Sequence, residues 1–491
     1  MAQQNTSSAG RLRPNNRKPL ILNAAVMNTP SHVSPGLWRH PTNHSAEYTN
    51  LKYWTDLAQR LDDANFHTLF ITDSLGSFDV YKGPHNAGPA IESGAQFPIN
   101  DPLLLVPSMA AATTNLVFGV TASVTYDHPY SLARRFSTLD HLTNGRVAWN
   151  VVTSFLTSAA RNHGLEEQIE HDERYRRADE FLDVTYKLWE GSWRDDAVTK
   201  NIQSGQYANS DLVQEIHHRG KYFKVPGPHV CEPSPQRTPF IFQAGSSKAG
   251  KDFAAKHAEA VFVGSQLPEL VRPTVDAIKS TAQEKYGRDP NHIKVVVSIS
   301  VIVAETDEAA TRKRDELLSY GNIEGALTLF GGWTGIDMSK YSDDEDFRFV
   351  NDYAIRSVLD KWSSTVPGSE NLPWSKKRIA EYIMLGGYGA KVTGSPETVV
   401  NELERWIEIG GVDGFNFGSI TVPGTFDDLI KFVLPVLKER GWLRADIEKD
   451  KEGATAREVF LGTPRLTEDH PGHRYTWARD GDRPVFPSNT E

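Results

Sequence analysis

The sequence predicts a TIM barrel, an α/β fold in which each of eight parallel strands precedes a helix, here with two insertions and a C-terminal extended arm. Eight short apolar runs, rich in β-branched and aromatic residues, alternate with longer segments of helical periodicity. The main competitor is a doubly wound open sheet. No GxGxxG pattern follows an early strand, which disfavours the dinucleotide-binding version of that sheet.

The first half of the chain supplies four strands and four helices. We expect strands at residues 20–27, 67–73, 116–125 and 146–153. In the first helical segment, Leu51, Trp54, Leu57 and Leu61 recur at the spacing that places them on one helix face. We therefore expect helices at residues 48–65, 101–114, 130–142 and 174–189.

The second half repeats this alternation with two interruptions. Strands are expected at residues 240–243, 260–264, 293–304 and 412–417. Helices are expected at residues 248–258, 267–286, 395–409 and 426–440. The interruptions are polar insertions near residues 190–238, where we expect a short hairpin, and 320–392.

The two ends of the chain differ from this pattern. Residues 1–19 have no apolar core and are expected to form a disordered tail, which leaves 20–445 for the barrel. Residues 446–491 are charged, contain proline and lack periodicity. We expect them to form an extended arm laid over a neighbouring subunit of a homo-oligomer.

Composition narrows the function classes. The formal charge of −10 disfavours nucleic acid and anionic membranes as partners. A single cysteine, Cys231, excludes a disulfide framework and suits a reducing compartment. No apolar run approaches the length of a membrane span, so the cytoplasm is the expected location.

The segment 239–258, PFIFQAGSSKAGKDFAAKHA, combines a strand, a turn and a helix start. Glycine permits close backbone approach, and the first N–H groups of a helix, together with its dipole, attract a phosphate. Gly245 to Lys251 fit GxxxxGK, but Asp252 stands where a nucleotide-triphosphate loop needs Ser or Thr. The segment therefore suits a single phosphate, as on FMN, although on this stretch alone an ordinary capped helix is the better explanation.

Polar residues follow several predicted strands. In a TIM barrel the catalytic groups lie at the C-terminal ends of the strands. Each residue taken alone has an ordinary structural explanation, such as capping a turn, but their recurrence at one end of the barrel favours a site. These residues are Asn28, His32, Asp73, Thr121, Ser123, His128, Asn150, Thr153, Ser246 and Ser247.

Other chemistries fit the sequence less well. A metal hydrolase on this fold needs a His-x-His pair, and none occurs, so no metal site is expected. No G-x-S-x-G elbow is present. The neighbours of Cys231, Glu232 and Pro233, offer no activation for a cysteine nucleophile.

Long stretches of the chain carry a family signature. They include NAAVMNTPSHVSPGLWRHP at 23–41, ESGAQFPINDPLLLVPSMAAAT at 92–113, the run 159–193 containing HDERYRRADE, the QAGSS loop and GVDGFNF at 411–417. As a set, these stretches closely resemble the nitrilotriacetate, long-chain alkane and dibenzothiophene sulfone monooxygenases. Those enzymes are a branch of the bacterial-luciferase-like flavin monooxygenases. The resemblance covers most of residues 20–443.

The resemblance implies a barrel that binds reduced FMN. The FMN contacts it implies are Asp73, Thr121, His171, Tyr175, Ser246 and Ser247. We add Ser123, Asn150 and Thr153 from their positions at strand ends. His171 and Tyr175 are four residues apart, which places both on one helical face.

The resemblance also implies the reaction. FMNH2, supplied by a separate NAD(P)H:flavin reductase, reacts with O₂ to form a C4a-peroxyflavin, which transfers one oxygen atom to a small organic molecule. His32 matches a family position near the flavin and is the candidate for directing protons there. In the alkane enzyme a cysteine stands at the position of Thr29, so that feature does not transfer.

Two alternatives stay open. One is a flavin-binding protein without oxygenase activity, which the presence of His32 and its aromatic loop disfavours. The other is a deazaflavin-dependent dehydrogenase of the same superfamily, which the AARN and HDERY motifs disfavour. The substrate does not follow from the sequence, because we expect the two insertions to build most of its pocket.

Overall fold

The structure is a computed structural model that describes residues 19–245, 247–350, 359, 362–366, 372–443 and 453–486. Eight parallel strands close into a barrel, and the last pairs with the first. In order around the barrel they are β1 (Ile21–Met27), β2 (Thr68–Thr72), β3 (Val117–Ser123), β4 (Val147–Val152), β9 (Phe240–Gln243), β10 (Ala260–Val263), β11 (Lys294–Val303) and β13 (Gly414–Gly418). The predicted TIM barrel and its eight strands are confirmed.

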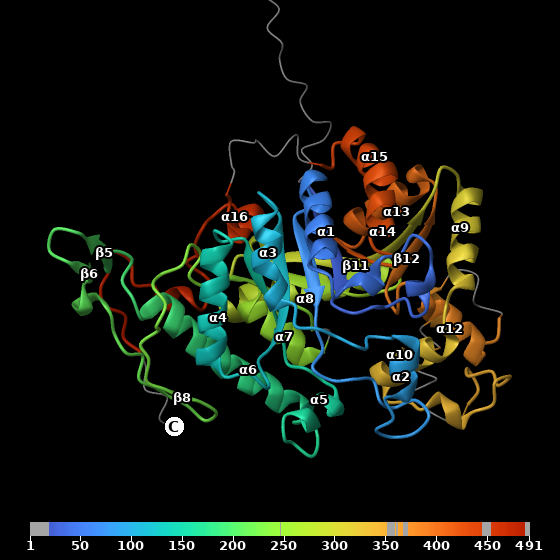
Figure 1. The fold of residues 1–491 in the computed structure, drawn as a ribbon, viewed down its shortest axis with the longest axis horizontal. Helices are drawn as coiled ribbons and strands as arrows, with labels where there is room; N and C mark the ends of the chain where they lie inside the picture. Colours follow the sequence, from blue (N-terminus) through green and yellow to red (C-terminus); the bar gives the residue numbers. More distant parts are fainter. Residues whose placement is uncertain are drawn as a thin grey trace, which may run out of the picture.

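Helices surround the strands (Figure 1). The longer ones are α1 (Leu51–Asp63), α4 (Pro129–Leu142), α6 (His171–Tyr186), α7 (Lys248–His257), α8 (Pro268–Tyr286), α9 (Asp307–Ser319) and α13 (Pro396–Glu408). The shorter ones are α2 (Gly88–Ser93), α3 (Val106–Ala111), α5 (Thr157–Asn162), α14 (Gly424–Asp428) and α15 (Leu434–Glu439). Helix α6 begins three residues before its predicted start, because the Glu170 carboxylate accepts hydrogen bonds from the first free N–H groups.

Aromatic rings fill the axis of the barrel. Phe70, Phe242 and Phe262 pack against one another, with ring centroids 4.3 to 5.9 Å apart. Gly119 on β3 makes room for them, since a Cβ there would lie 3.0 to 3.2 Å from Phe70, Thr68 and Phe242. These rings fill the barrel interior beneath the C-terminal ends of the strands, where TIM barrels bind their ligands.

The C-terminal segment closes the opposite end of the barrel. Helix α16 (Ala456–Leu461) places Phe460 against Phe240, the first residue of β9, with stacked rings 4.7 Å apart. Arg457 of the same helix forms a fully buried ion pair with Glu259. Where the sequence suggested an extended arm, residues 453–486 contain a capped helix that packs on its own barrel, because its apolar and charged side chains find partners there.

The first insertion forms two small hairpins. Strands β5 (Val198–Asn201) and β6 (Gln206–Ala208) pair antiparallel, as do β7 (His218–Arg219) and β8 (Lys224–Val225). A single hairpin was expected in this segment. The β5–β6 hairpin projects from the left edge of the molecule in Figure 1, far from the second insertion on the right.

The second insertion has a core of its own. Helices α10 (Ile323–Thr334) and α12 (Lys376–Met384) pack together around buried aromatic and aliphatic side chains. A ninth strand, β12 (Ala390–Gly394), pairs parallel with the second half of β11, beyond the part of β11 that belongs to the barrel wall. Strand β12 was not among the predicted strands, because its five residues straddle the expected end of the insertion.

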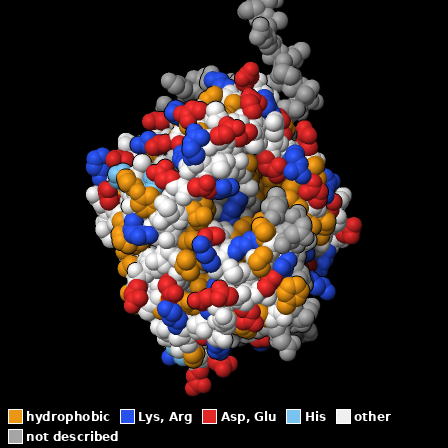
Figure 2. Space-filling view, turned by 90° about the vertical axis from the view of Figure 1, so that its right-hand side faces the viewer, with side chains coloured by type: hydrophobic (Ala, Val, Ile, Leu, Met, Phe, Trp, Pro, Cys, Tyr) orange, Lys and Arg blue, Asp and Glu red, His pale blue; other side chains and the backbone are white. Residues whose placement is uncertain are grey.

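Charged side chains of both signs are interspersed over the face shown in Figure 2, with hydrophobic side chains in small groups between them. Within the described ranges, no helix is both long and apolar enough to cross a membrane.

Candidate active site

Two adjoining cavities lie at the C-terminal ends of the strands. The outer cavity has a volume of about 380 Å³ and lies between α6, the start of α7 and the ends of β2 and β4. The inner cavity, of about 390 Å³, continues over the barrel axis toward β11 and β13. Six residues line both cavities, among them His32, Thr72, Asp73 and Trp333. The two volumes therefore form one composite site.

The start of α7 forms one wall of the outer cavity. The Ser247 hydroxyl caps the helix by accepting a hydrogen bond from the Gly250 N–H at 3.0 Å. Gly245 and Gly250 lie in contact, and a Cβ on either would come within 2.9 Å of the other's backbone. Only glycine permits this packing, which brings the positive end of the helix dipole to the cavity.

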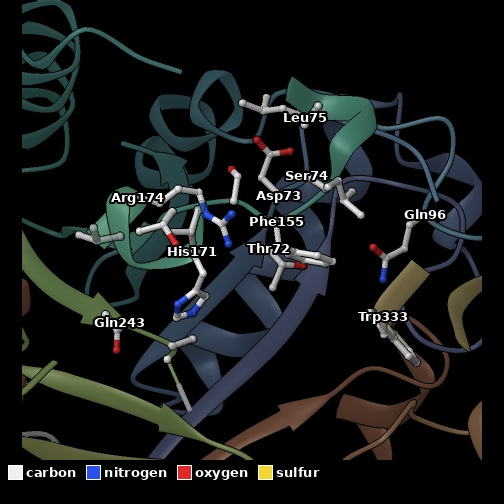
Figure 3. Close-up of a pocket in the computed structure, with 18 of the residues that line it drawn as sticks. Thr72, Asp73, Ser74, Leu75, Gln96, Phe155, His171, Arg174, Gln243 and Trp333 are labelled. Carbon is white, nitrogen blue, oxygen red and sulfur yellow. The ribbon is translucent and has the colours of Figure 1, made fainter. Parts of the chain in front are cut away.

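Helix α6 supplies the facing side chains. His171, Arg174 and Tyr175 all line the outer cavity, and the rings of His171 and Tyr175 lie 5.2 Å apart. Arg174 is 8% exposed, and its guanidinium points into the pocket from the left in Figure 3. Its Nε atom has no hydrogen-bond partner among the described residues. A buried cation with an unused donor, opposite a helix N-terminus, is suited to an anion.

The inner cavity is mainly apolar, with a polar floor. Phe262, Trp333 and Tyr388 contribute aromatic surface. On the floor, the Asn150 amide donates to the Thr121 hydroxyl at 2.9 Å. The Oδ1 atom of Asn150 is buried and has no partner within the described part of the chain. A ligand N–H group would satisfy this acceptor.

His32 is buried where the two cavities meet. Its Nε2 atom lies 3.2 Å from the Thr72 hydroxyl oxygen, and that hydroxyl in turn donates to the carbonyl oxygen of Val26 at 3.1 Å. Thr72 is thus the acceptor, so Nε2 carries the proton and Nδ1 is left as a base. Burial lowers the pKa of His32 to about 4, which keeps the imidazole neutral.

Asp73 faces the same volume from the end of β2. Burial raises the pKa of its carboxyl group to about 7, against the opposing effect of the Ser74 N–H, and the charge of Asp101 contributes in the same direction as burial. Asp73 therefore exchanges a proton in the neutral range. Its side chain lies at the top of the pocket in Figure 3, while Gln96 and Trp333 lie at the right.

The structure distributes the predicted site residues as follows. The outer cavity is lined by His32, Asp73, Thr153, His171, Tyr175 and Ser247, and the inner cavity by His32, Asp73, Thr121 and Asn150. Ser246 lies outside the described residues. Ser123 lines neither cavity, because its hydroxyl is bonded at 2.8 Å to that of Ser154, which stands between it and the outer cavity wall. His128 is exposed, as its ordinary explanation held, and it also caps α4.

Several lining residues were not predicted. They are Gln96, Phe155, Arg174, Gln243, Trp333 and Tyr388. Gln243 was placed at the end of a strand and Trp333 in an insertion, and only the position of Gln243 as the first residue of the QAGSS loop marked it as a candidate. Lining residues were expected from both insertions, but those described here come from the second only. The first insertion instead packs against the outer side of α6, where Lys221 and Tyr222 both donate hydrogen bonds to the Glu173 carboxylate.

Known proteins resemble this chain over most of its length. A family model described as luciferase-like monooxygenase matches residues 35–413. The dimethyl-sulfide monooxygenase of Hyphomicrobium sulfonivorans is 45% identical over 471 residues, 96% of either chain. The long-chain alkane monooxygenase of Geobacillus thermodenitrificans is 46% identical over 459 residues, 93% of this chain and 98% of the relative.

A solved structure is also similar. It is that of a riboflavin lyase with modified FMN and its substrate riboflavin. Its TM-score is 0.82 at 32% identity, and the match covers 94% of this chain and 100% of the lyase.

Proposed function

The chain belongs to the luciferase-like monooxygenase family, and we propose that it uses FMNH2 from a separate NAD(P)H:flavin reductase to transfer one atom of O₂ to a small, uncharged organic molecule. Membership of this family and 45% identity to named monooxygenases make the chain a monooxygenase. Neither alternative from the sequence, a binding protein or a dehydrogenase, explains these relatives as well.

The observation that carries the proposal is the arrangement of charge across the composite site. Anion-binding groups, Arg174 and the start of α7, lie at one end. Proton-exchanging groups, His32 and Asp73, lie at the other, where the inner cavity begins. This arrangement suits a ligand that has a phosphate at one end and a reactive ring at the other. FMN is such a ligand.

The residues present fit FMN. Arg174, Tyr175, Ser247 and the α7 N–H groups would hold the phosphate. The unpaired Oδ1 of Asn150 would accept a hydrogen bond from the ring system. When bound in the reduced form, the cofactor supplies the electrons that activate O₂.

The chain's own contribution is to shield the reacting end of the site from bulk water and to move protons there. Trp333 and Phe78 line the outer cavity and are apolar, so they exclude bulk water from the reacting end. The Nδ1 atom of His32 is a base in the neutral imidazole, and Asp73 titrates near pH 7. These two groups are therefore equipped to accept or return a proton at the reacting end.

The lining of the inner cavity supports an uncharged substrate. Among its described lining residues, the only acidic or basic side chains are His32 and Asp73, and neither is a cation at pH 7.5. A polycarboxylate would lose its hydration there and find no cation to replace it. Apolar organic molecules and thioethers meet no such cost. Relatives named for dimethyl sulfide and for long-chain alkanes agree with this class.

Isotope labelling tests the proposal. The protein is mixed anaerobically with chemically reduced FMN and then exposed to ¹⁸O₂ with a panel of thioethers, alkanes and polycarboxylates. We expect one ¹⁸O atom in the product of a thioether or an alkane, detected by mass spectrometry, and none in any polycarboxylate. Oxidised FMN without a reductant is the control. Absence of labelled product across the panel, or labelling of a polycarboxylate alone, would contradict the proposal.

A further inference from the structure

We propose that a polar passage behind His32 carries to the active site the proton that each turnover consumes, with Tyr53 as its outer member. This inference rests on the proposed function. With the anionic form of the reduced cofactor, the balance is FMNH⁻ + H⁺ + O₂ + S → FMN + SO + H₂O. One proton must therefore arrive from solvent in each cycle, although the reacting end is shielded from bulk water.

Three cavities follow one another from the site to the surface. The composite site shares Met27 and His32 with a small cavity of about 20 Å³ behind β1. That cavity shares Tyr53 and Val422 with a third one, of about 200 Å³, between α1 and the loop after β13. His32 is the inner boundary of the small cavity and Tyr53 is its outer boundary.

The small cavity has the size and the chemistry of a water site. One water molecule needs roughly 10–15 Å³ of such space and two to four polar partners. The lining supplies seven polar side chains besides His32, namely Thr29, Ser31, Ser34, Asn43, Ser45, Tyr53 and Ser419. The hydroxyl oxygen of Thr29 and Nδ1 of His32 are both buried, and neither has a hydrogen-bond partner in the described ranges. A water molecule between them would satisfy both.

Titratable groups surround the outer end. His44, Glu47, Asp56 and Arg60 line the third cavity together with Tyr53, and the His44 ring lies 2.8 Å from the Glu47 carboxylate. More than half of the His44 and Glu47 side-chain surfaces is exposed, so these groups exchange protons with solvent. They place a proton source against the outer side of Tyr53.

Every member of the passage can both accept and donate a hydrogen bond, as a relay requires. Burial and the charge of Glu47 raise the pKa of Tyr53, which keeps its hydroxyl protonated. In this tautomer of His32, the Nε2–H group points to Thr72. The Nδ1 atom is the base and is the ring nitrogen without a hydrogen-bond partner among the described residues. A proton taken up at Nδ1 releases the one at Nε2 to the Thr72 hydroxyl, whose own proton then turns from the Val26 carbonyl oxygen to the active site that Thr72 lines.

Two hydroxyl deletions test the passage kinetically. Tyr53→Phe and Thr29→Val keep the shape of each side chain and remove its hydroxyl. Reoxidation of bound FMNH2 by O₂ is followed in a single turnover, in H₂O and in D₂O. We expect Tyr53→Phe to slow this reoxidation at least about 10-fold, which is less than the full effect of losing an acid–base group. We also expect the ratio of the rates in H₂O and D₂O to rise. FMN affinity should stay within about two-fold.

Tyr48→Phe is the matched control, because Tyr48 lies five residues before Tyr53 and lines none of the three cavities. It should behave as wild type. A crystal structure of the ligand-free protein adds a reading that does not depend on turnover. We expect an ordered water within hydrogen-bond distance of His32 Nδ1 and the Tyr53 hydroxyl.

The outcomes separate this inference from the proposed function. If wild type does not oxygenate with FMNH2, the proposed function fails, and the water site is still tested by crystallography. If wild type oxygenates while Tyr53→Phe matches it in rate and isotope effect, the passage is overturned. A dry small cavity overturns it as well.

Discussion

Arg457 and Glu259 form an ion pair in which both side chains are almost completely buried, with 2.6 Å between Nε and Oε1. Glu259 also accepts a hydrogen bond from the Ile241 N–H, and Arg457 donates to the carbonyl oxygen of Thr238. The pair thus ties α16 to two barrel strands. Without its partner, either group would be an uncompensated charge inside the protein.

We therefore expect Arg457→Met to lower the free energy of unfolding by about 3–5 kcal/mol, the range for breaking one side of a buried pair. Urea denaturation measures this. The double variant Arg457→Met/Glu259→Gln should regain part of the loss, because no charge is then left buried. Arg479→Met, at a side chain that is 75% exposed, is the control and should change little. A single variant as stable as wild type would contradict the expectation.

Arg174 should distinguish FMN from riboflavin. If it contacts the phosphate, Arg174→Gln should weaken FMN binding by about 1.5–3 kcal/mol, the value of a charge-assisted hydrogen bond. Riboflavin affinity should hardly change. Arg176→Gln is the matched control, because Arg176 is on the same helix but pairs with Glu173 outside the cavity. Calorimetric titration with FMN and with riboflavin measures the two affinities. An equal loss of affinity for both ligands would show that Arg174 does not contact the phosphate.

The serines before α7 make a second test of the phosphate end. Replacing Ser246 and Ser247 with alanine should weaken FMN binding much more than riboflavin binding. Ser247→Ala alone also removes the cap from α7, at a cost of about 1 kcal/mol in stability. Thermal unfolding of the apoprotein separates the two effects. A shift in unfolding without any selective loss of FMN would mean that Ser247 is only a cap.

His32 should matter for chemistry and not for holding the cofactor. We expect His32→Ala to leave FMN affinity within a few-fold of wild type, since the imidazole lies away from Arg174 and Ser247. Oxygenation should fall by about 10²-fold or more, the scale of a lost acid–base group, with hydrogen peroxide released instead. His128→Ala, which removes a helix cap outside both cavities, is the control. Normal oxygenation by His32→Ala would show a structural role.

Acid should destabilise the protein through His32. Its pKa is about 4 when folded and about 6.5 when unfolded, so the unfolded chain takes up this proton first. Stability from neutral His32 is complete above pH 6.5 and is lost as the pH falls toward 4. At pH 5 the loss is about 2 kcal/mol. Urea denaturation at pH 7.5 and at pH 5 measures this. The free energy of unfolding of His32→Gln should fall by about 2 kcal/mol less than that of wild type between these two pH values. If the free energies of unfolding of wild type and His32→Gln fell by the same amount over this pH range, the expectation would be contradicted.

The chain alone should not oxidise NAD(P)H. It carries no dinucleotide-binding glycine pattern, and the site described here suits a mononucleotide. Absorbance at the NADH band should stay constant with FMN and substrate present, and should fall only when a flavin reductase is added. Steady consumption by the purified chain would show a second cofactor site.

The sequence predicted the barrel because its strands are apolar runs separated by helices of regular period, and burial inside a parallel sheet favours such runs. It failed at β12, since Ala390–Gly394 is a strand only because β11 continues beyond the barrel wall to pair with it. It failed also at Arg174. Among the charges of HDERYRRADE, nothing in the local pattern distinguishes a cation turned toward a cavity from its solvent-exposed neighbours.

The site residues found by strand-end position illustrate the same limit. Asp73, Thr121 and Asn150 are near the axis because parallel strands all end on the same side. Ser123 ends the same strand as Thr121, yet it lines neither cavity, and its hydroxyl bonds Ser154. Such differences depend on the tilt and register of the closed sheet, which no local pattern encodes.

The ten-residue strand β11 belongs to the barrel in its first half and holds β12 with its second. The second insertion, which includes Trp333 and Tyr388, joins the sheet through this one strand pairing, outside the barrel wall, and α10 also packs against α2. Under the proposed function, changes in this insertion would alter one wall of the inner cavity while leaving α6 and α7, the proposed phosphate end, in place. Divergence within this lineage should concentrate substitutions, insertions and deletions between β11 and β12, while the opposite wall drifts slowly.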